Sequence, residues 1–308
     1  MIWLEDDDIR AALSMADAVQ VMRAAFRDRA AGTLVSPERT GIDAGRQRLV
    51  WTPGGFRDSG EVGLRLYVRG GLADDQVTLL WDGDGHLRAI AHGSYLGQLR
   101  TGAIGGLAVD VLARPESETL GVIGLGAQAR TQIEAALSVR RIRRIVAFRR
   151  NRAALQDETA RLERAFGVEV HAAERPQDVV QTADILVLAT SSSTSVVSGE
   201  ALRPGMHVNS LGQTSTARHE IGVDVLEAAD ELACDVPELY RGEPDFIAQG
   251  TPHLDRMQDL AVLVAGGYRR TPEAITVFLS HGLPGTEVAL LRAVVERART
   301  LGLGRALR

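Results

Sequence analysis

The stretch GLGAQA at residues 124–129 constrains the fold more than any other part of the sequence. It follows the apolar run TLGVIG (119–124) and opens a segment with helical spacing, ARTQIEAALSV (129–139). The pattern Gly-x-Gly-x-x-Ala between a buried strand and a helix is typical of a dinucleotide-binding turn. The first glycine permits the tight turn, the second lets the backbone approach a pyrophosphate, and the alanine allows close helix packing. The helix N-terminus then offers unpaired N–H groups to the phosphates. A glycine turn without a ligand is the alternative, and the strand–turn–helix context argues against it.

Strands and helices alternate beyond Pro115. Strands are predicted at 144–148, 168–172, 184–190, 206–212 and 231–236, and helices at 152–166 and 176–183. This alternation predicts an α/β fold with a doubly wound parallel sheet of the Rossmann type.

The pattern before Pro115 is different. Residues 8–31 have the apolar spacing of an amphipathic helix, and 33–92 read as short strands, with a hairpin at the Asp-Gly pairs of WDGDG (81–85). An apolar helix is predicted at 96–112, and the tail from 285 returns to an amphipathic helix. A chain of 308 residues exceeds what one core usually supports, so two domains are expected.

One predicted strand, EVGLRLYVRG (61–70), carries an arginine that needs an explanation. Period two places Val62, Leu64, Leu66 and Val68 on one face and Arg65 on the other, with Tyr67 and Arg69. The simplest interpretation is an apolar face turned to the core and an arginine in solvent.

Composition excludes several classes of function. The net charge of −5 provides no basic field for nucleic acid, and no apolar run reaches the length of a membrane span. The lone Cys234 cannot form an intrachain disulfide, and the acidic N-terminus lacks the features of a signal peptide. A cytoplasmic protein without nucleic-acid or membrane partners is expected.

The end of the second Rossmann strand favours one cofactor. It reads FRRNR, with Arg149, Arg150 and Arg152 where NAD-binding folds usually place an acid for the ribose hydroxyls. Guanidinium groups suit a 2′-phosphate, so NADP(H) is favoured over NAD(H). The earlier arginine run VRRIRR (139–144) is interpreted as a solvated helix end outside the pocket.

The stretch RTGAIGGLAVDVLARPESETLGVIGLGAQAR (100–130) resembles the ornithine cyclodeaminase/mu-crystallin family, and ATSSS (189–193), LRPGMHVNSLG (202–212) and ITVFLSHG (275–282) extend the resemblance over nearly the whole chain. The resemblance implies an α+β substrate-binding and dimerisation domain, residues 1–114 plus 285–308, with the Rossmann domain inserted as residues 115–284. It also implies a homodimer and hydride transfer at a carbon that bears nitrogen, next to a carboxylate.

Site residues follow from the resemblance. Arg100 and Arg39 lie where relatives hold a substrate carboxylate, and His281 follows a segment that borders the substrate pocket. The residues expected to bind the cofactor are Thr101, Gly124, Gly126, Ala127, Gln128, Ala129, Arg149, Arg150, Arg152, Thr190, Ser191, Ser210, Leu211 and Gly212. No metal site is expected.

Two departures from the family pattern concern proton transfer. Arg65 stands where relatives have a catalytic lysine, and Thr214 where cyclodeaminases have an aspartate; the sequence contains no lysine at all. Arginine does not exchange protons usefully near neutral pH. His92 and His281 are candidate substitutes, because histidine titrates in the useful range, although a surface or packing role is the plainer interpretation of each.

These observations predict an NADP(H)-dependent oxidoreductase that reduces an imine, or runs the reverse reaction, on a small amino-acid-derived carboxylate, with Arg65, Thr214 and His92 as the catalytic candidates. Two alternatives stay open. One is a divergent ornithine or lysine cyclodeaminase, and the other is a non-catalytic, NADPH-dependent ligand-binding protein of the mu-crystallin type.

Overall fold

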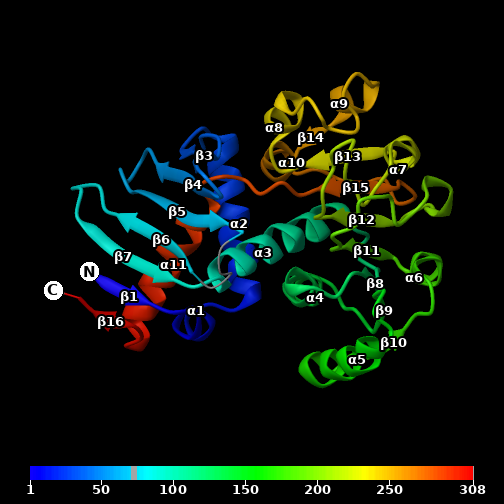
Figure 1. Ribbon diagram of the computed structural model, residues 1–308, viewed down its shortest axis with the longest axis horizontal. Coiled ribbons are helices and arrows are strands. Elements are labelled where there is room, and N and C mark those ends of the chain that lie inside the picture. The colour runs from blue at the N-terminus through cyan, green and yellow to red at the C-terminus, as the bar shows by residue number, and fades with distance from the viewer. Residues whose placement is uncertain (71–74, 308) are drawn as a thin grey trace. The chain divides into compact units, whose positions relative to one another are not determined.

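The structure, a computed structural model, describes residues 1–70 and 75–307 and divides into two units (Figure 1). Unit 1 comprises Met1–Ala103 and Leu283–Arg308, and unit 2 comprises Ile104–Gly282. Parts of two predictions, residues 71–74 of the strand region and residue 308 of the tail, lie outside the described residues.

The division between the units falls elsewhere than predicted, at 103/104 and 282/283 instead of 114/115 and 284/285. The reason is the helix α3 (Tyr95–Leu112), which is continuous and contributes its first half to unit 1 and its second half to unit 2. No helix in the described ranges is long and apolar enough to cross a bilayer.

Unit 1 is built on an eight-stranded sheet, of which one path runs β16-β1-β7-β6-β5-β4-β2 while β3 pairs with β4. The strands are β1 (Ile2–Leu4), β2 (Leu34–Val35), β3 (Thr40–Ala44), β4 (Gln47–Phe56), β5 (Val62–Arg69), β6 (Gln76–Trp81), β7 (Leu87–His92) and β16 (Arg305–Ala306). The predicted hairpin at 81–85 joins β6 and β7.

The helices of unit 1 are α1 (Asp6–Ala12), α2 (Met15–Ala30) and α11 (Thr286–Leu301). The single helix predicted at 8–31 is therefore two helices. The chain is extended at Leu13, and the Ser14 hydroxyl accepts a hydrogen bond from the N–H of Asp17 at 3.2 Å, which starts α2.

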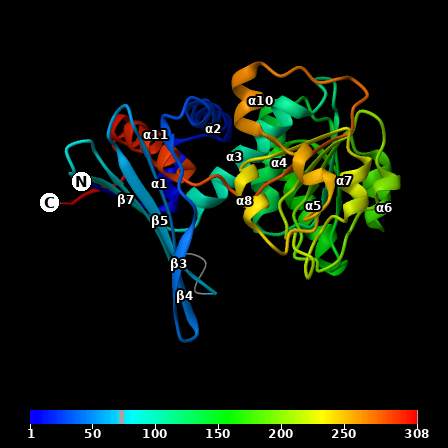
Figure 2. The same cartoon turned by 90° about the horizontal axis from the view of Figure 1, so that it is seen from above.

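The helix α11 packs against β4, β5 and β6 on one face of this sheet (Figure 2). At Gly63 an added Cβ would lie 3.1 Å from the Val288 side chain, so the Gly63 and Arg65 face of β5 is the inner one. The simplest interpretation of β5, with its apolar face buried and Arg65 in solvent, is therefore wrong. Val62 and Val68, on the apolar face, are 53% and 37% exposed, because α11 brings both its apolar side chains and a charged partner for Arg65 to the other face.

Unit 2 contains the predicted Rossmann sheet, with all its strands parallel in the order β10-β9-β8-β11-β12-β15-β13-β14. The strands are β8 (Thr119–Ile123), β9 (Arg144–Phe148), β10 (Glu169–Ala172), β11 (Ile185–Leu188), β12 (His207–Ser210), β13 (Glu231–Cys234), β14 (Gln258–Asp259) and β15 (Thr276–Leu279). The strand β15 lies in the motif ITVFLSHG, where no strand was predicted.

Helices cover both faces of this sheet, as Figure 1 shows. They are α4 (Ala127–Val139), α5 (Ala153–Phe166), α6 (Pro176–Thr182), α7 (Val223–Ala228), α8 (Pro237–Gly242), α9 (Pro252–Arg256) and α10 (Leu260–Gly266), with the 3-10 turn η1 at Gly199–Ala201. One core cluster joins α3, α4 and α5 to the sheet, and the other joins α6 and α7 to its opposite face.

Arg140 is not the solvated helix end that its arginine run predicted. Its guanidinium donates to the carbonyls of Val109, Asp110, Ala113 and Arg114 and pairs with the Asp110 carboxylate at 2.7 Å. These carbonyls lie at the C-terminal end of α3, where a cation is favoured. Arg140 therefore fixes α3 to the end of α4.

His207 on β12 is a buried histidine held between two side chains. One ring nitrogen lies 2.8 Å from the Thr276 hydroxyl and the other 2.8 Å from the Asn209 amide oxygen. Burial lowers the pKa of His207 to about 3, although the hydrogen bond to Asn209 opposes the shift. The ring is thus neutral in the folded protein at neutral pH.

This depressed pKa predicts acid sensitivity. Between pH 6.5 and 3 the unfolded chain binds the His207 proton more tightly than the folded chain, so stability falls as pH falls through that window. His207 alone should make the free energy of unfolding about 2 kcal/mol lower at pH 5 than at pH 7. Urea unfolding of His207→Gln should show a pH dependence weakened by that amount. The control Gln156→Ala, at an exposed site of the same unit that carries no titratable group, should leave it unchanged.

Candidate functional site

The turn between β8 and α4 has the geometry that a phosphate cradle needs. Gly124 has φ +92°, and a Cβ there would lie 2.4 Å from the carbonyl oxygen of Ala189, so no other residue fits. Gly126 precedes the first turn of α4 and faces open space. Ala129 is 2% exposed and packs inside the helix–sheet core.

A cavity of about 770 Å³ opens over this turn. Its lining includes ten of the fourteen residues predicted to bind a cofactor: Gly124, Gly126, Ala127, Gln128, Arg149, Arg150, Thr190, Ser191, Leu211 and Gly212. The other lining residues were not predicted from the sequence; they are Ile123, Leu125, Phe148, Asn151, Pro176, Gln177, Ala189, Ser192, Ser195 and Val196. None of these twenty residues is acidic.

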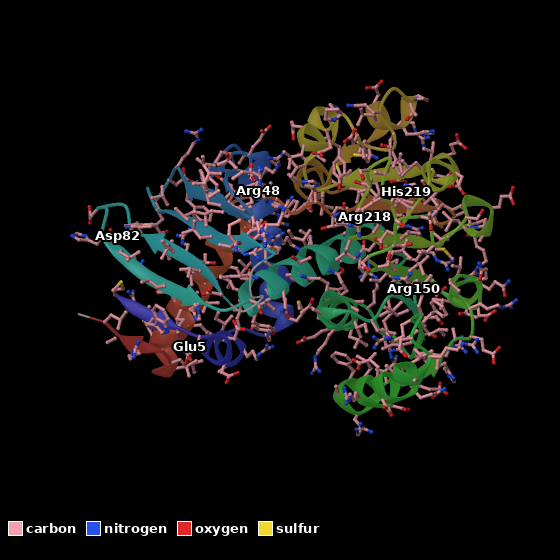
Figure 3. The ribbon with its side chains drawn as sticks, in the orientation of Figure 1. Glu5, Arg48, Asp82, Arg150, Arg218 and His219 are labelled. Carbon is pink, nitrogen blue, oxygen red and sulfur yellow. The ribbon has the colours of Figure 1, made fainter. Side chains whose placement is uncertain are left out.

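Four predicted residues do not line the cavity. Ala129 is buried, and Thr101 lies in unit 1, where its hydroxyl donates to the Gly97 carbonyl. The Ser210 hydroxyl donates to the Glu220 carboxylate, and Arg152 donates to the carbonyl of Glu174. Two arginines at the end of β9, Arg149 and Arg150, therefore remain beside the cavity; Figure 3 labels Arg150.

A second cluster lies in unit 1 on the inner face of the sheet. Arg100 on α3 and Arg65 on β5 both bond the same carboxylate oxygen of Glu287 on α11, at 2.5 and 3.3 Å. All three side chains are at most 15% exposed. Burial opposes ionisation of Glu287, but the charges of Arg100 and Arg65 outweigh it and lower the pKa of the carboxyl. Glu287 is thus an anion between two cations.

Arg65 has further contacts. Its guanidinium donates to the side-chain oxygen of Gln76 and lies 4.8 Å from the ring centre of Tyr67. Burial lowers the pKa of Arg65, and Glu287 works against that shift. Arg65 is therefore a fixed charge inside unit 1, and the simpler interpretation of a solvated arginine is wrong.

Three buried polar atoms at this cluster have no hydrogen-bond partner within the described chain. They are Nε of Arg39, Nε of Arg100 and the second carboxylate oxygen of Glu287. Arg39 is close enough to Arg65 to lower its pKa. Three guanidiniums and one carboxylate leave an excess of two positive charges, which suits an anionic ligand.

Of the two predicted histidines, His92 shares unit 1 with this cluster but does not join it. On the sheet, Arg65 pairs with Thr78 and Thr78 with Ala91, so His92 projects to the opposite face, where it stacks on Trp3. His281 belongs to unit 2, where its N–H donates to Asp235 and its ring lies edge-on to Tyr240.

Thr214 also belongs to unit 2, in the loop after β12. It pairs with His219 across a short bridge and its carbonyl accepts from Ile247 N–H at 2.9 Å. Figure 3 labels His219 and its neighbour Arg218 on this loop. Sequence reasoning missed both Glu287 and Glu220, the two buried glutamates that hold the site residues.

Comparison with known proteins supports these assignments of fold and family. Residues 3–301 match the model of the ornithine cyclodeaminase/mu-crystallin family. A Delta(1)-pyrroline-2-carboxylate reductase of Bacillus cereus is 30% identical over 70% of this chain and 68% of its own. An alanine dehydrogenase of Archaeoglobus fulgidus is 28% identical over 98% and 96%.

Among solved structures, the Delta(1)-pyrroline-2-carboxylate reductase of Thermococcus litoralis in complex with NADH and L-proline is similar over the full length of both chains. Its TM-score is 0.91 at 26% sequence identity. The chain described here is therefore a member of the ornithine cyclodeaminase/mu-crystallin family.

Proposed function

We propose that this protein is an NADP(H)-dependent oxidoreductase that reduces the C=N bond of a small carboxylate-bearing imine, or catalyses the reverse reaction. The observation that carries the proposal is that one chain contains both a dinucleotide-type cavity, in unit 2, and a buried, net positive arginine cluster, in unit 1. The similarity to pyrroline-2-carboxylate reductases and an alanine dehydrogenase supports the same reaction class.

The cavity residues fit a nicotinamide dinucleotide. The backbone of Gly124–Gln128 would hold the pyrophosphate at the start of α4, and Gly126 leaves open the space that a side chain would fill. When bound, the reduced cofactor supplies a hydride. Arg149 and Arg150 would contact the adenosine ribose, and the absence of an acid from the lining favours a 2′-phosphate there.

The arginine cluster would bind the substrate carboxylate. Among the described residues, Arg39 and Arg100 each keep a buried N–H without a partner, and Arg65 adds a third cation. Two guanidiniums on one carboxylate fix its orientation, which is what hydride transfer to the neighbouring carbon requires. Glu287 positions Arg65 and Arg100, and its negative charge offsets the repulsion between the two guanidiniums.

Arg65 cannot serve as an acid or base, because a guanidinium stays protonated. Its proposed role is electrostatic: it stabilises negative charge on the bound substrate. Since no lysine exists in the chain, an imine that arrives already protonated fits this site better than a reaction that must take a proton from an amine.

The function is tested by incubating the protein with NADPH and a panel of cyclic ketimines, or of 2-oxo acids with amines, while cofactor absorbance is followed. Turnover is expected, and Arg65→Ala should lose about 2 kcal/mol of substrate binding, roughly thirtyfold, with NADPH affinity unchanged. Conversion of ornithine or lysine with release of ammonia and no net cofactor change would establish the cyclodeaminase instead. Cofactor-dependent ligand binding without turnover would establish the binding protein.

Glu287→Gln should destabilise the protein by about 3 kcal/mol, because it leaves two buried guanidiniums without their anion. The matched control is Glu296→Gln on the same helix. Glu296 is 63% exposed and pairs with Arg88 at 3.0 Å, and an ion pair at such a position contributes at most about 1 kcal/mol. Equal urea midpoints for the two variants would contradict the assigned role of Glu287.

Cofactor preference is expected to depend on Arg150. NADPH should bind more tightly than NADH, and Arg150→Ala should reduce that preference roughly tenfold by removing one charge-assisted contact to the 2′-phosphate. Arg152→Ala is the control, because Arg152 lies outside the cavity lining. Calorimetry with both cofactors measures the preference, and equal affinities in the wild type would refute it.

We propose that the protein is a homodimer and that the outer face of the unit 1 sheet is the interface between the two copies. Ile42, Val62 and Val68 are exposed there, next to an apolar cavity of about 490 Å³ that includes Leu64 and Trp81. A related archaeal alanine dehydrogenase is a dimer. Light scattering should give twice the chain mass for the wild type and for the control Val262→Asp, an exposed site in unit 2, but a monomer for Val62→Asp.

A further inference from the structure

Glu220 is a fully buried carboxylate that accepts five hydrogen bonds. One oxygen accepts from the N–H and the hydroxyl of Thr190, both at 2.8 Å. The other accepts from the Ser210 hydroxyl at 2.9 Å, from Leu211 N–H at 2.9 Å and from Gly212 N–H at 2.6 Å. Within the described ranges no cation pairs with it, so these five donors alone compensate its burial.

These donors come from two separate loops. Thr190 follows β11, while Leu211 and Gly212 follow β12, the neighbouring parallel strand. The backbone of Glu220 adds two more links: its N–H donates to the Gln213 carbonyl, and its carbonyl accepts from Val196 N–H. One residue therefore joins the whole rim that these loops contribute to the cavity, namely Thr190, Ser191, Ser192, Ser195, Val196, Leu211 and Gly212.

The packing around Glu220 is too close for another arrangement of the loops. A Cβ at Gly212 would lie 2.4 Å from its carboxylate carbon. An ionised carboxylate only accepts hydrogen bonds, which matches five donors; an amide of the same shape would direct its own N–H groups at two of them. Because buried donors without acceptors are costly, the loops depend on the charge of Glu220 as well as on its size.

The position of this rim indicates which half of a dinucleotide it serves. In a doubly wound sheet the ligand lies across the carboxyl ends of the strands where the strand order reverses, here between β8 and β11. The adenosine half would lie towards β9, beside Arg149 and Arg150. The nicotinamide half would then lie over the loops after β11 and β12.

We propose that Glu220 is a positioning residue that holds the nicotinamide side of the cavity in its binding shape before the cofactor arrives. It does not line the cavity and acts only through the two loops. If these loops are already ordered, the entropic cost of ordering them on ligand binding is smaller and the affinity is higher. The proposal rests on the proposed dinucleotide function of the cavity.

The test is Glu220→Gln, with binding of NADPH, NADH and adenosine 2′,5′-bisphosphate measured by calorimetry. The dinucleotides should bind at least tenfold more weakly, while the bisphosphate, which lacks the nicotinamide half, should change less than twofold. A general loss of folding would weaken the binding of all three ligands equally, so the difference between dinucleotides and bisphosphate identifies the positioning role. Equal losses for all three ligands, or no loss for any, would overturn the proposal.

Ser210→Ala keeps the test decisive if the first variant does not fold. It removes one of the five hydrogen bonds from a residue outside the cavity lining, so it should weaken dinucleotide binding about threefold and spare the bisphosphate. Glu200→Gln, the same chemical change at an exposed residue, should have no effect. Failure of the wild type to bind any dinucleotide would instead refute the function assigned to the cavity.

Discussion

The arginine cluster of unit 1 depends on the ion pairs that the buried Glu287 carboxylate makes with Arg65 and Arg100. Arg65 and Arg100 come from a strand and a helix, and without an anion between them their burial would be strongly unfavourable. Glu287 belongs to α11, more than 180 residues further along the chain. The return of the C-terminal helix to the N-terminal sheet is thus a condition for the cluster as well as for the core.

Unit 2 uses a second buried glutamate for a related purpose. In the described part of the chain Glu220 has no arginine partner, and it accepts hydrogen bonds from backbone N–H groups and hydroxyls of two loops. Under the proposed function, the anion in each unit organises groups that contact a ligand: cations in unit 1 and loop backbone in unit 2. The physical reason is the same in both units: burying a carboxylate is costly unless hydrogen-bond donors surround it.

The sequence predicted the alternating architecture of unit 2 well, since buried strands and amphipathic helices have different periods. The period-two pattern did not predict the buried face of β5, because specific side-chain contacts determine that face. On β5 the apolar residues Val62 and Val68 face outward because the Arg65–Glu287 pair and the packing at Gly63 determine the inner face. Glu220 could not have been found, because three of its donors are backbone groups that any residue carries.

The replacement of lysine by Arg65 narrows the chemistry that this site can support. Held by Glu287 and Gln76, the Arg65 guanidinium has fixed contacts and a permanent charge. A lysine there could release a proton and accept it back, whereas this arginine can only stabilise charge. Under the proposed function, the departures at Arg65 and Thr214 therefore favour reduction of a protonated imine. That step needs a bound carboxylate and a hydride, but no base to take a proton from an amine.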